Sequence, residues 1–368
     1  MTVMPWYRCL QEKDLDTPCL LVYPDRIAEN ISRMIQMAGD VSRLRPHIKT
    51  HKTAEIITMQ MDMGIHKFKC ATIAEAELLA KCGAGDVLLA MQPVGTNIKD
   101  FLALSAKYPH TLFSALVDNA PSLREMADMA SAHNTKVSLW MDINNGMDRT
   151  GIEPDEKALR LYLHMVQNPH IIEKGLHVYD GHLHTSDPHL RKKECDLAFE
   201  KVRQLCSELE RTGTTPPCII AGGTPTFPFH ATRAGVETSP GTPLLWDAGY
   251  HDSFPDLDFL PAAVLASRVV SKPMQGLVCF DLGHKSVASE MPLPRVHFLS
   301  LEGVEQVSQS EEHLVVRPTN AEEVNIGDIH YAIPRHICPT VAKYPVLLPL
   351  VKNGRSGEWK VAARDHRL

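Results

Sequence analysis

The chain has 368 residues, 44% hydrophobic and 22% charged, an ordinary globular composition with length for two cores or for one large barrel with an added domain. The net charge of −6 argues against a nucleic-acid or membrane-surface partner, and no apolar stretch approaches the roughly 18 residues that a membrane span needs. Because no basic flank and long apolar run open the chain, and nine scattered cysteines suggest reduced thiols, we expect no signal peptide and a cytoplasmic location.

Up to Trp246, short apolar or β-branched runs alternate with helical stretches. We expect eight strands, at Val41–Ile48, Lys67–Ala71, Asp86–Ala90, Thr111–Leu116, Lys136–Asp142, Lys174–Tyr179, Cys218–Ala221 and Gly235–Thr238. Helices are expected at Thr53–Met61, Ile73–Lys81, Ile98–Ala106, Pro121–Ala132, Pro154–Val166 and Lys192–Arg211. This α/β alternation implies parallel strands with crossover helices, and eight strands close a (β/α)8 TIM barrel. An open doubly wound sheet is the competing fold.

After Trp246 the pattern changes to short strand-like runs separated by turn signals, with weak helical periodicity. The runs are Val264–Ser271, Leu277–Asp281, Arg295–Leu301, Leu314–Arg317, Asp328–Ile333, Val346–Val351 and Trp359–Ala362. They predict a C-terminal antiparallel β domain. The strand-like segment Asp16–Val22 could pair with this domain. We therefore expect a barrel over residues 25–245 and a β domain made of residues 1–24 and 246–368.

Lys49, in the basic segment Arg45–Lys52 (Arg-Pro-His-Ile-Lys-Thr-His-Lys), falls at the carboxyl end of the first expected barrel strand. Active sites of this barrel gather at that end, so Lys49 is a candidate nucleophile. Neighbouring cations, Arg45, Lys52 and His51, would favour a neutral amine able to react with a carbonyl group. The alternative is a basic loop in solvent.

Two glycine-bearing loops strengthen that interpretation. Gly222, Gly223 and Thr224 follow the seventh expected strand, and Gly241 and Thr242 follow the eighth. The loops after these two strands are the usual phosphate site of the barrel, because glycines let backbone N–H groups close on a phosphate. A reactive lysine beside a phosphate site indicates pyridoxal 5′-phosphate (PLP).

Two further strand ends carry side chains that could contact this cofactor. Arg149 lies in the loop after the fifth expected strand and could hold the cofactor's phenolate oxygen. Tyr179 ends the sixth and could hydrogen-bond the pyridine nitrogen. A capped turn with a surface arginine and a tyrosine at the end of the barrel core are the respective alternatives.

His336 and Cys338 lie in the β domain, in Pro334-Arg-His-Ile-Cys-Pro-Thr340. On a strand, residues two apart point to the same side, so this pair could bind one metal ion and leave positions for water and substrate. Imidazole with thiolate suits zinc best. An unliganded pair is the alternative.

Together, the segment Arg45–Lys52, the loop Gly222–Thr226 and His336-X-Cys338 resemble the D-threonine aldolase and D-serine dehydratase family, fold-type III PLP enzymes related to alanine racemase. The resemblance runs from Asp16-Thr-Pro to the metal motif. It implies that Lys49 carries the cofactor, that Arg149 and Tyr179 contact its ring, and that the enzyme is a homodimer. It also implies a divalent metal at His336 and Cys338. Manganese-dependent aldolases of the family have Asp in place of this Cys, so zinc and manganese both stay open.

The resemblance implies a lyase acting on β-hydroxy-D-amino acids. We expect retro-aldol cleavage to glycine and an aldehyde, with His182 or His184 as the base for the β-hydroxyl. Dehydration to a keto acid and ammonia uses almost the same site and is the alternative. A racemase, which needs no metal, and a non-catalytic cofactor-binding protein are less favoured; the extra C-terminal domain with its His-X-Cys pair argues against the latter.

Overall fold

The computed structural model describes residues 4–365 and divides the chain into two units. The barrel unit takes Met34–Lys49 and Ile57–Gly241, and the β unit takes the residues up to Arg33, Thr50–Ile56 and Thr242–Arg364. Helices α1 (Pro24–Ala38) and α2 (Ala54–Asp62) contribute residues to both units. The domain boundaries expected at residues 24/25 and 245/246 stay a prediction.

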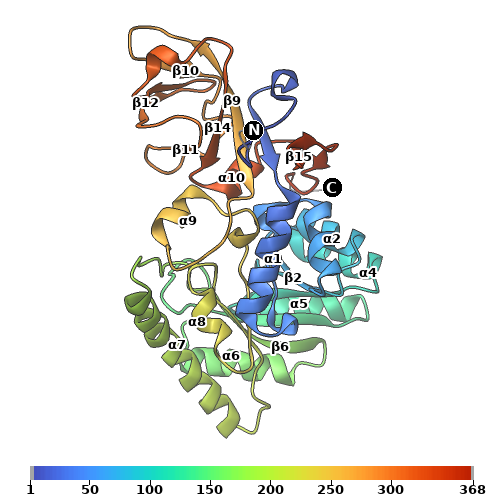
Figure 1. Ribbon diagram of the computed structural model, residues 1–368. Helices are drawn as coiled ribbons and strands as arrows, with labels where there is room; N and C mark the ends of the chain where they lie inside the picture. The colour runs from blue at the N-terminus through green and yellow to red at the C-terminus, as the bar shows by residue number, and fades with distance from the viewer. Residues whose placement is uncertain (1–3, 366–368) are drawn as a thin grey trace. The chain divides into compact units, whose positions relative to one another are not determined.

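The barrel unit is built on seven parallel strands in sequential order. They are β2 (Lys67–Cys70), β3 (Asp86–Leu89), β4 (Leu112–Val117), β5 (Val137–Ile143), β6 (Ile171–Val178), β7 (Ile219–Ala221) and β8 (Val236–Thr238). The connecting helices are α3 (Ile73–Lys81), α4 (Thr96–Lys107), α5 (Ala120–Ala132), α6 (Glu156–Gln167), α7 (Pro188–Arg211) and α8 (Phe227–Ala231). In Figure 1, α6 and α7 lie along the outside of this unit.

The helices form where a cap and an apolar stripe coincide. In α6, Asp155 accepts a hydrogen bond from the backbone N–H of Lys157 at 2.7 Å, and Ala158, Leu161 and Met165 are buried. A cap at the first turn and buried residues spaced by three and four are the pattern of an amphipathic helix packed on a sheet. Each buried Leu or Met contributes about 2 kcal/mol to folding.

The first expected strand, Val41–Ile48, is wrong as a continuous strand. Its two ends are 3-10 turns, Val41–Arg43 and Ile48–Thr50. Between them, Leu44 bridges Thr238 of β8 and His47 bridges Lys69 of β2, both in parallel. The segment therefore closes the sheet between β8 and β2, but it cannot extend a regular ladder because Pro46 lacks an N–H.

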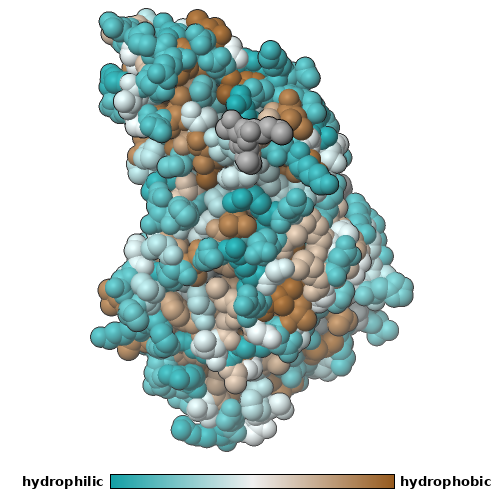
Figure 2. Space-filling model, viewed as in Figure 1, coloured by the Kyte–Doolittle hydropathy of each residue, from teal (hydrophilic) through white to brown (hydrophobic). Residues whose placement is uncertain are grey.

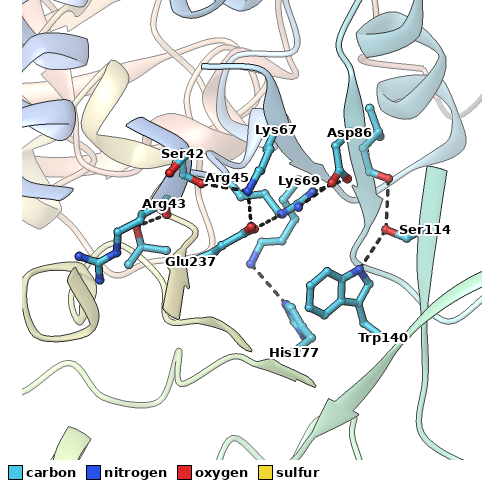
Figure 3. Close-up of polar contacts among 12 residues, drawn as sticks. Ser42, Arg43, Arg45, Lys67, Lys69, Asp86, Ser114, Trp140, His177 and Glu237 are labelled. Carbon is cyan, nitrogen blue, oxygen red and sulfur yellow. Dashed lines mark hydrogen bonds and ion pairs between the residues drawn. The ribbon is translucent and has the colours of Figure 1, made fainter. Parts of the chain in front are cut away.

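Arg45 is buried in this closing segment and bound to two carboxylates (Figure 3). Its Nη1 and Nη2 donate to Asp86 at 2.7 and 3.0 Å, and its Nε donates to Glu237 at 2.8 Å. Burial lowers the pKa of Arg45, but these carboxylates outweigh it and raise the pKa above its usual value. Arg45 is therefore a buried cation held by two carboxylates, and its expected effect on the Lys49 amine stays a prediction.

The β unit is a ten-stranded, mainly antiparallel sheet. Its strands are β1 (Cys19–Val22), β9 (Ala263–Ser271), β10 (Val278–Phe280), β11 (Val296–Phe298), β12 (Glu305–Gln309), β13 (Leu314–Arg317), β14 (Ile329–Pro334), β15 (Val346–Val351), β16 (Gly354–Arg355) and β17 (Trp359–Lys360). Two short helices, α9 (Ala248–Ser253) and α10 (Ile337–Val341), belong to the same unit. β1 pairs with β9 and β15, which confirms that the segment Asp16–Val22 pairs with the β domain.

A core of alternate strand residues holds the β unit together. Leu21, Val264, Tyr331 and Leu350 belong to one buried cluster. Figure 2 shows hydrophilic residues over much of the visible face, with several groups of apolar residues among them. In the described part of the chain, no helix has both the length and the apolar character to cross a bilayer.

Candidate active site

The carboxyl ends of the barrel strands carry most of the expected cofactor residues. Lys49 is exposed, in the 3-10 turn that follows the closing segment, and its backbone N–H donates to His47 Nδ1 at 3.2 Å. His51, expected as a neighbouring cation, is fully buried, and burial lowers its pKa to about 3. His51 is therefore neutral, so its expected contribution of charge is wrong.

The loop after β7 has the shape of a phosphate cradle. Gly222 has a φ of 79°, and an added Cβ would lie 2.6 Å from a ring carbon of His230. An added Cβ on Gly223 would lie 3.0 Å from the Tyr179 ring. The backbone N–H of Gly241, after β8, donates to Thr224 Oγ1 at 3.4 Å, so the two loops meet. Thr242 lies at the start of the β unit, where its Oγ1 is 3.8 Å from Cys338 Sγ.

Next to this cradle lies a buried hydroxyl group that makes no hydrogen bond in the described part of the chain. This group is Ser239 Oγ. Ser239 follows β8 directly, two residues before Gly241. A buried hydroxyl without a partner costs free energy, and a phosphate oxygen would satisfy it. The cradle and this hydroxyl fit the phosphate group of PLP.

A network behind the cradle fixes its shape. Thr226 Oγ1 donates to Asp180 Oδ1 at 2.7 Å and accepts from the Gly223 N–H at 3.3 Å. His230 Nε2 lies 2.7 Å from Asp180 Oδ2, while Arg233 Nη1 donates to His230 Nδ1 at 2.7 Å. Since the arginine occupies the Nδ1 lone pair, the imidazole proton must sit on Nε2 and point at the carboxylate.

Asp180 and His230, with Cys195, form the one place in the described chain where three possible metal-ligand atoms lie within 4.8 Å of one another. The three side chains contact one another, with Cys195 Sγ 3.5 Å from His230 Nε2 and 3.7 Å from Asp180 Oδ2, and burial raises the pKa of the Cys195 thiol to about 12. The cluster lies directly behind the glycine loop and supports it through Thr226 and Asp180.

Two cations flank the Tyr179 ring. The guanidinium carbon of Arg149 is 5.0 Å from the ring centroid, and Lys69 Nζ is 5.6 Å from it. Arg149 is exposed, in a loop whose Gly151 N–H donates to Asp118 Oδ2 at 3.0 Å. The structure thus brings Arg149 and Tyr179 together, next to Gly223.

Lys69, which was not predicted from the sequence as a site residue, is buried, and its amine points toward His177 (Figure 3). Its Nζ is 3.4 Å from His177 Nε2, and His177 Nδ1 is 2.7 Å from Asp142 Oδ1. Burial, and then the charge of Lys49, lower the pKa of Lys69 to about 7. Burial, and then the Lys69 charge, also lower the pKa of His177. A detectable signal was a lysine alternating with apolar residues in a barrel strand, where parallel sheets are usually apolar throughout.

The two histidines proposed as a base differ in environment. His182 is half-buried, and within the described residues its Nδ1 is buried without a hydrogen-bond partner. A Cβ on Gly146 would lie 2.9 Å from His182 Nε2, so the ring packs on the loop that carries Arg149. His184 is exposed. An unsatisfied imidazole nitrogen makes His182 the stronger candidate.

The expectation that His336 and Cys338 project from a strand is wrong. β14 ends at Pro334, His336 is the N-cap of α10, and Cys338 lies in the first turn of that helix. The turn is favoured because Pro339 suits a helix start but cannot join a strand ladder, and because Asp247 Oδ2 accepts the Ile337 N–H at 2.9 Å.

The two side chains nevertheless meet. Burial lowers the pKa of His336, but its hydrogen bond to Cys338 and the Glu290 carboxylate outweigh burial and raise the pKa to about 9. Glu290 contacts His336 Nδ1. Cys338 Sγ lies 3.2 Å from Thr50 Oγ1. A metal-binding histidine usually has a carboxylate on its second ring nitrogen, as His336 has Glu290, and a cysteine thiolate is itself a common metal ligand. The pair His336 and Cys338 therefore fits a divalent ion.

Comparison with known families agrees with this architecture. A family model described as "Alanine racemase, N-terminal domain" matches residues 22–245, and one described as "Putative serine dehydratase domain" matches residues 262–350. The first match covers more than half of the chain. The chain therefore belongs to the alanine racemase N-terminal domain family, whose enzymes depend on PLP.

Relatives narrow the enzyme class. The chain is 26% identical to the 3-hydroxy-D-aspartate aldolase of Paracoccus denitrificans over 96% of this chain and 94% of that protein. It is 22% identical to the D-threo-3-hydroxyaspartate dehydratase of a Delftia species, over 94% and 97%. The structure of the D-threonine aldolase from Filomicrobium marinum superposes with a TM-score of 0.89 at 25% identity, over 98% of both chains. The chain is accordingly a PLP-dependent lyase.

Proposed function

We propose that the chain cleaves β-hydroxy-D-amino acids to glycine and an aldehyde, with PLP and a divalent metal ion. The observation that carries the proposal is the glycine cradle after β7, closed by Tyr179 and flanked by an unsatisfied Ser239 hydroxyl. Aldolases acting on 3-hydroxy-D-aspartate and D-threonine, similar to this chain over nearly its whole length, support the substrate class.

Lys49 would carry the cofactor, and Gly222, Gly223, Thr224 and Gly241 would hold its phosphate, with Thr242 after them. Arg149 and Tyr179 would contact the ring. When bound, PLP supplies an electron sink for the electrons left on Cα as a bond to it breaks. The hydrogen bonds of Asp180 to Thr226 and His230 would hold the loop in place before a ligand binds, which would reduce the cost of binding.

His336 and Cys338 would hold the divalent ion, which supplies Lewis-acid character at the β-oxygen. Zinc and manganese are the candidates. His182 would accept the β-hydroxyl proton on its free Nδ1. His184 is the second candidate for this role, and its exposure suits proton exchange with solvent.

Dehydration to a keto acid and ammonia is the second candidate function. The match of residues 262–350 to a putative serine dehydratase domain favours it specifically. In this reaction Lys49 would remove the α-proton, and the chain's other groups would keep their places.

One assay separates these functions. The holoenzyme is incubated with D-threonine, D-serine and D-3-hydroxyaspartate, with and without divalent metal, and products are identified by mass spectrometry. We expect glycine and an aldehyde with metal present. Keto acid and ammonia would instead establish the dehydratase, whereas metal-independent exchange of the α-proton alone would establish a racemase. Light scattering on the same preparation tests our further expectation of a homodimer, and fractionation of the producing cells tests the cytoplasmic location.

Gly223→Val should weaken retention of PLP by at least about tenfold, because a side chain there meets the Tyr179 ring and blocks the backbone's approach to a phosphate. The measurement is the dissociation constant of PLP by absorbance titration. Gly85→Val is the matched control, since a Cβ there meets its nearest atom at 3.8 Å. Equal PLP affinity in Gly223→Val and the wild type would show that this loop is not the cradle.

A further inference from the structure

Lys69 is a buried cation whose surroundings provide no anionic hydrogen-bond partner. Its residue is 3% exposed, and within the described part of the chain its Nζ makes one hydrogen bond, to His177 Nε2 at 3.4 Å. An ammonium group has three donors, so two of them have no acceptor. A buried charge without a counter-ion is costly, and proteins keep one where a ligand supplies the missing charge.

The acceptor on His177 is fixed by the residue behind it. His177 Nδ1 lies 2.7 Å from Asp142 Oδ1, so that nitrogen carries the proton and Nε2 presents a lone pair to Lys69. Asp142 Oδ2 in turn accepts from Gln92 Nε2 at 2.8 Å, which also donates to Asp118 Oδ2 at 2.9 Å. The chain of hydrogen bonds therefore holds the Lys69 amine in one place.

The same chain of hydrogen bonds reaches the loop that carries Arg149. Asp118 Oδ2 accepts the backbone N–H of Gly151 at 3.0 Å. Lys69 and Arg149 both lie over the Tyr179 ring, at 5.6 and 5.0 Å from its centroid. The buried amine of Lys69, on β2, therefore lies close to Arg149 and Tyr179, the residues proposed to contact the cofactor ring.

We propose that Lys69, held by the His177–Asp142 pair, is a second functional lysine of this site whose ammonium binds an anionic oxygen, either on the cofactor ring or in the carboxylate of the amino-acid substrate. The inference rests on the proposed function. It adds a second lysine to that function: Lys49 would form the covalent link to the cofactor, whereas Lys69 would bind an anionic oxygen of the cofactor or the substrate.

The charges facing Lys69 explain why an anion is needed. Burial lowers the pKa of Lys69 most, and the positive charges of Lys49 and Arg45 lower it further, while Asp142 and Asp180 oppose them. Neutral His177 adds no charge, and burial keeps its own pKa low. The amine therefore titrates near neutral pH in the empty protein, and a bound anion would restore its proton.

The test compares Lys69→Met with the wild type in absorbance and calorimetric titrations. PLP tests the cofactor oxygen, and the pair D-alanine and D-alaninol, which differ by the carboxylate, tests the substrate. We expect at least a tenfold loss of affinity for PLP, or the same loss for D-alanine but not for D-alaninol. Lys69→Arg should recover part of it. Lys67→Met, on the same strand and paired with Glu237, is the control and should bind normally.

The melting temperature of the Lys69→Met variant distinguishes a lysine kept for ligand binding from one that stabilises the fold. Between the folded pKa near 7 and the unfolded value near 10.4, the unfolded chain binds more protons, so Lys69 makes stability rise with pH. Below pH 7 the full cost of the buried ammonium is present. Lys69→Met should therefore raise the melting temperature of the cofactor-free protein at pH 6, and by less at pH 10, while it weakens ligand binding. A structural lysine would give a lower melting temperature at both.

A measurement on the wild type makes the test independent of the variant. In the cofactor-free protein with ¹³C-ε-lysine, the NMR titration midpoint of Lys69 should rise by at least about one unit when PLP, D-alanine or inorganic phosphate is added. No shift with any probe, together with unchanged affinities in Lys69→Met, would overturn the proposal. If the wild type binds no PLP, the proposed function fails, and the phosphate and D-alanine titrations still decide the role of Lys69.

Discussion

Lys49→Ala is expected to lose the visible absorption band of bound PLP and to lower lyase activity by about a thousandfold or more. Lys49 is the exposed lysine that follows the barrel-closing segment, whereas the nearby Lys69 is buried. Only an accessible amine can exchange its covalent partner for the amino group of a substrate. The variant should still fold, because Lys49 packs in a solvent-facing turn.

Borohydride reduction followed by peptide mass spectrometry identifies the lysine directly. We expect the reduced cofactor on the peptide containing Lys49 in the wild type, and no such adduct in Lys49→Ala. Lys67→Ala, on the neighbouring strand β2, should keep both the band and the adduct. An adduct on Lys69 would reverse the roles assigned to the two lysines.

The barrel was predictable from local patterns because its helices and strands obey them. The helix expected at Ile73–Lys81 is found with the same bounds, since Thr72 caps it by accepting the Glu75 N–H and its residues are mostly Ala, Leu and Glu, which favour helices. The first strand was not predictable as found, because a proline in a short bridged segment leaves the sequence looking extended. What closes the sheet there is pairing with Thr238 and Lys69, which are distant in the sequence.

Some residues of the candidate site were likewise predictable from the sequence, and others were not. The glycine loops, Arg149 and Tyr179 were visible because strand ends of a barrel converge. The Lys69–His177 contact joins residues 108 positions apart, and the His177–Asp142 contact joins residues 35 apart. No local pattern reports such pairs. The neutral state of His51 and the ion pairs of Arg45 also follow from burial and partners that only the folded chain defines.

The sequence argument for the proposed metal pair, His336 and Cys338, was incomplete. Spacing by two suggested one face of a strand, yet the pair is brought together by an N-cap and the first turn of a five-residue helix. Helices this short carry too few residues for a periodic pattern. Glu290, 46 residues away, contacts the histidine and completes its orientation, which again no short motif contains.

Removal of the metal is expected to abolish lyase activity while bound PLP keeps its absorption band. The two proposed ligands, His336 and Cys338, would leave several coordination positions to water, so a chelator should extract the ion reversibly. The ion's proposed task concerns the β-oxygen, and the PLP-holding residues proposed for the barrel unit do not include these ligands. Activity should therefore return when zinc or manganese is added back.

Substitution of the thiol sharpens the test. Cys338→Ala should reproduce the chelated state, with a loss of activity of about a hundredfold or more. Cys338→Asp should keep a ligand of harder character, retain activity and prefer manganese over zinc. Cys218→Ala, which removes an exposed cysteine, is the matched control and should behave as the wild type. Full activity after exhaustive chelation, with no metal found by elemental analysis, would remove the Lewis acid from the mechanism and bring the racemase forward.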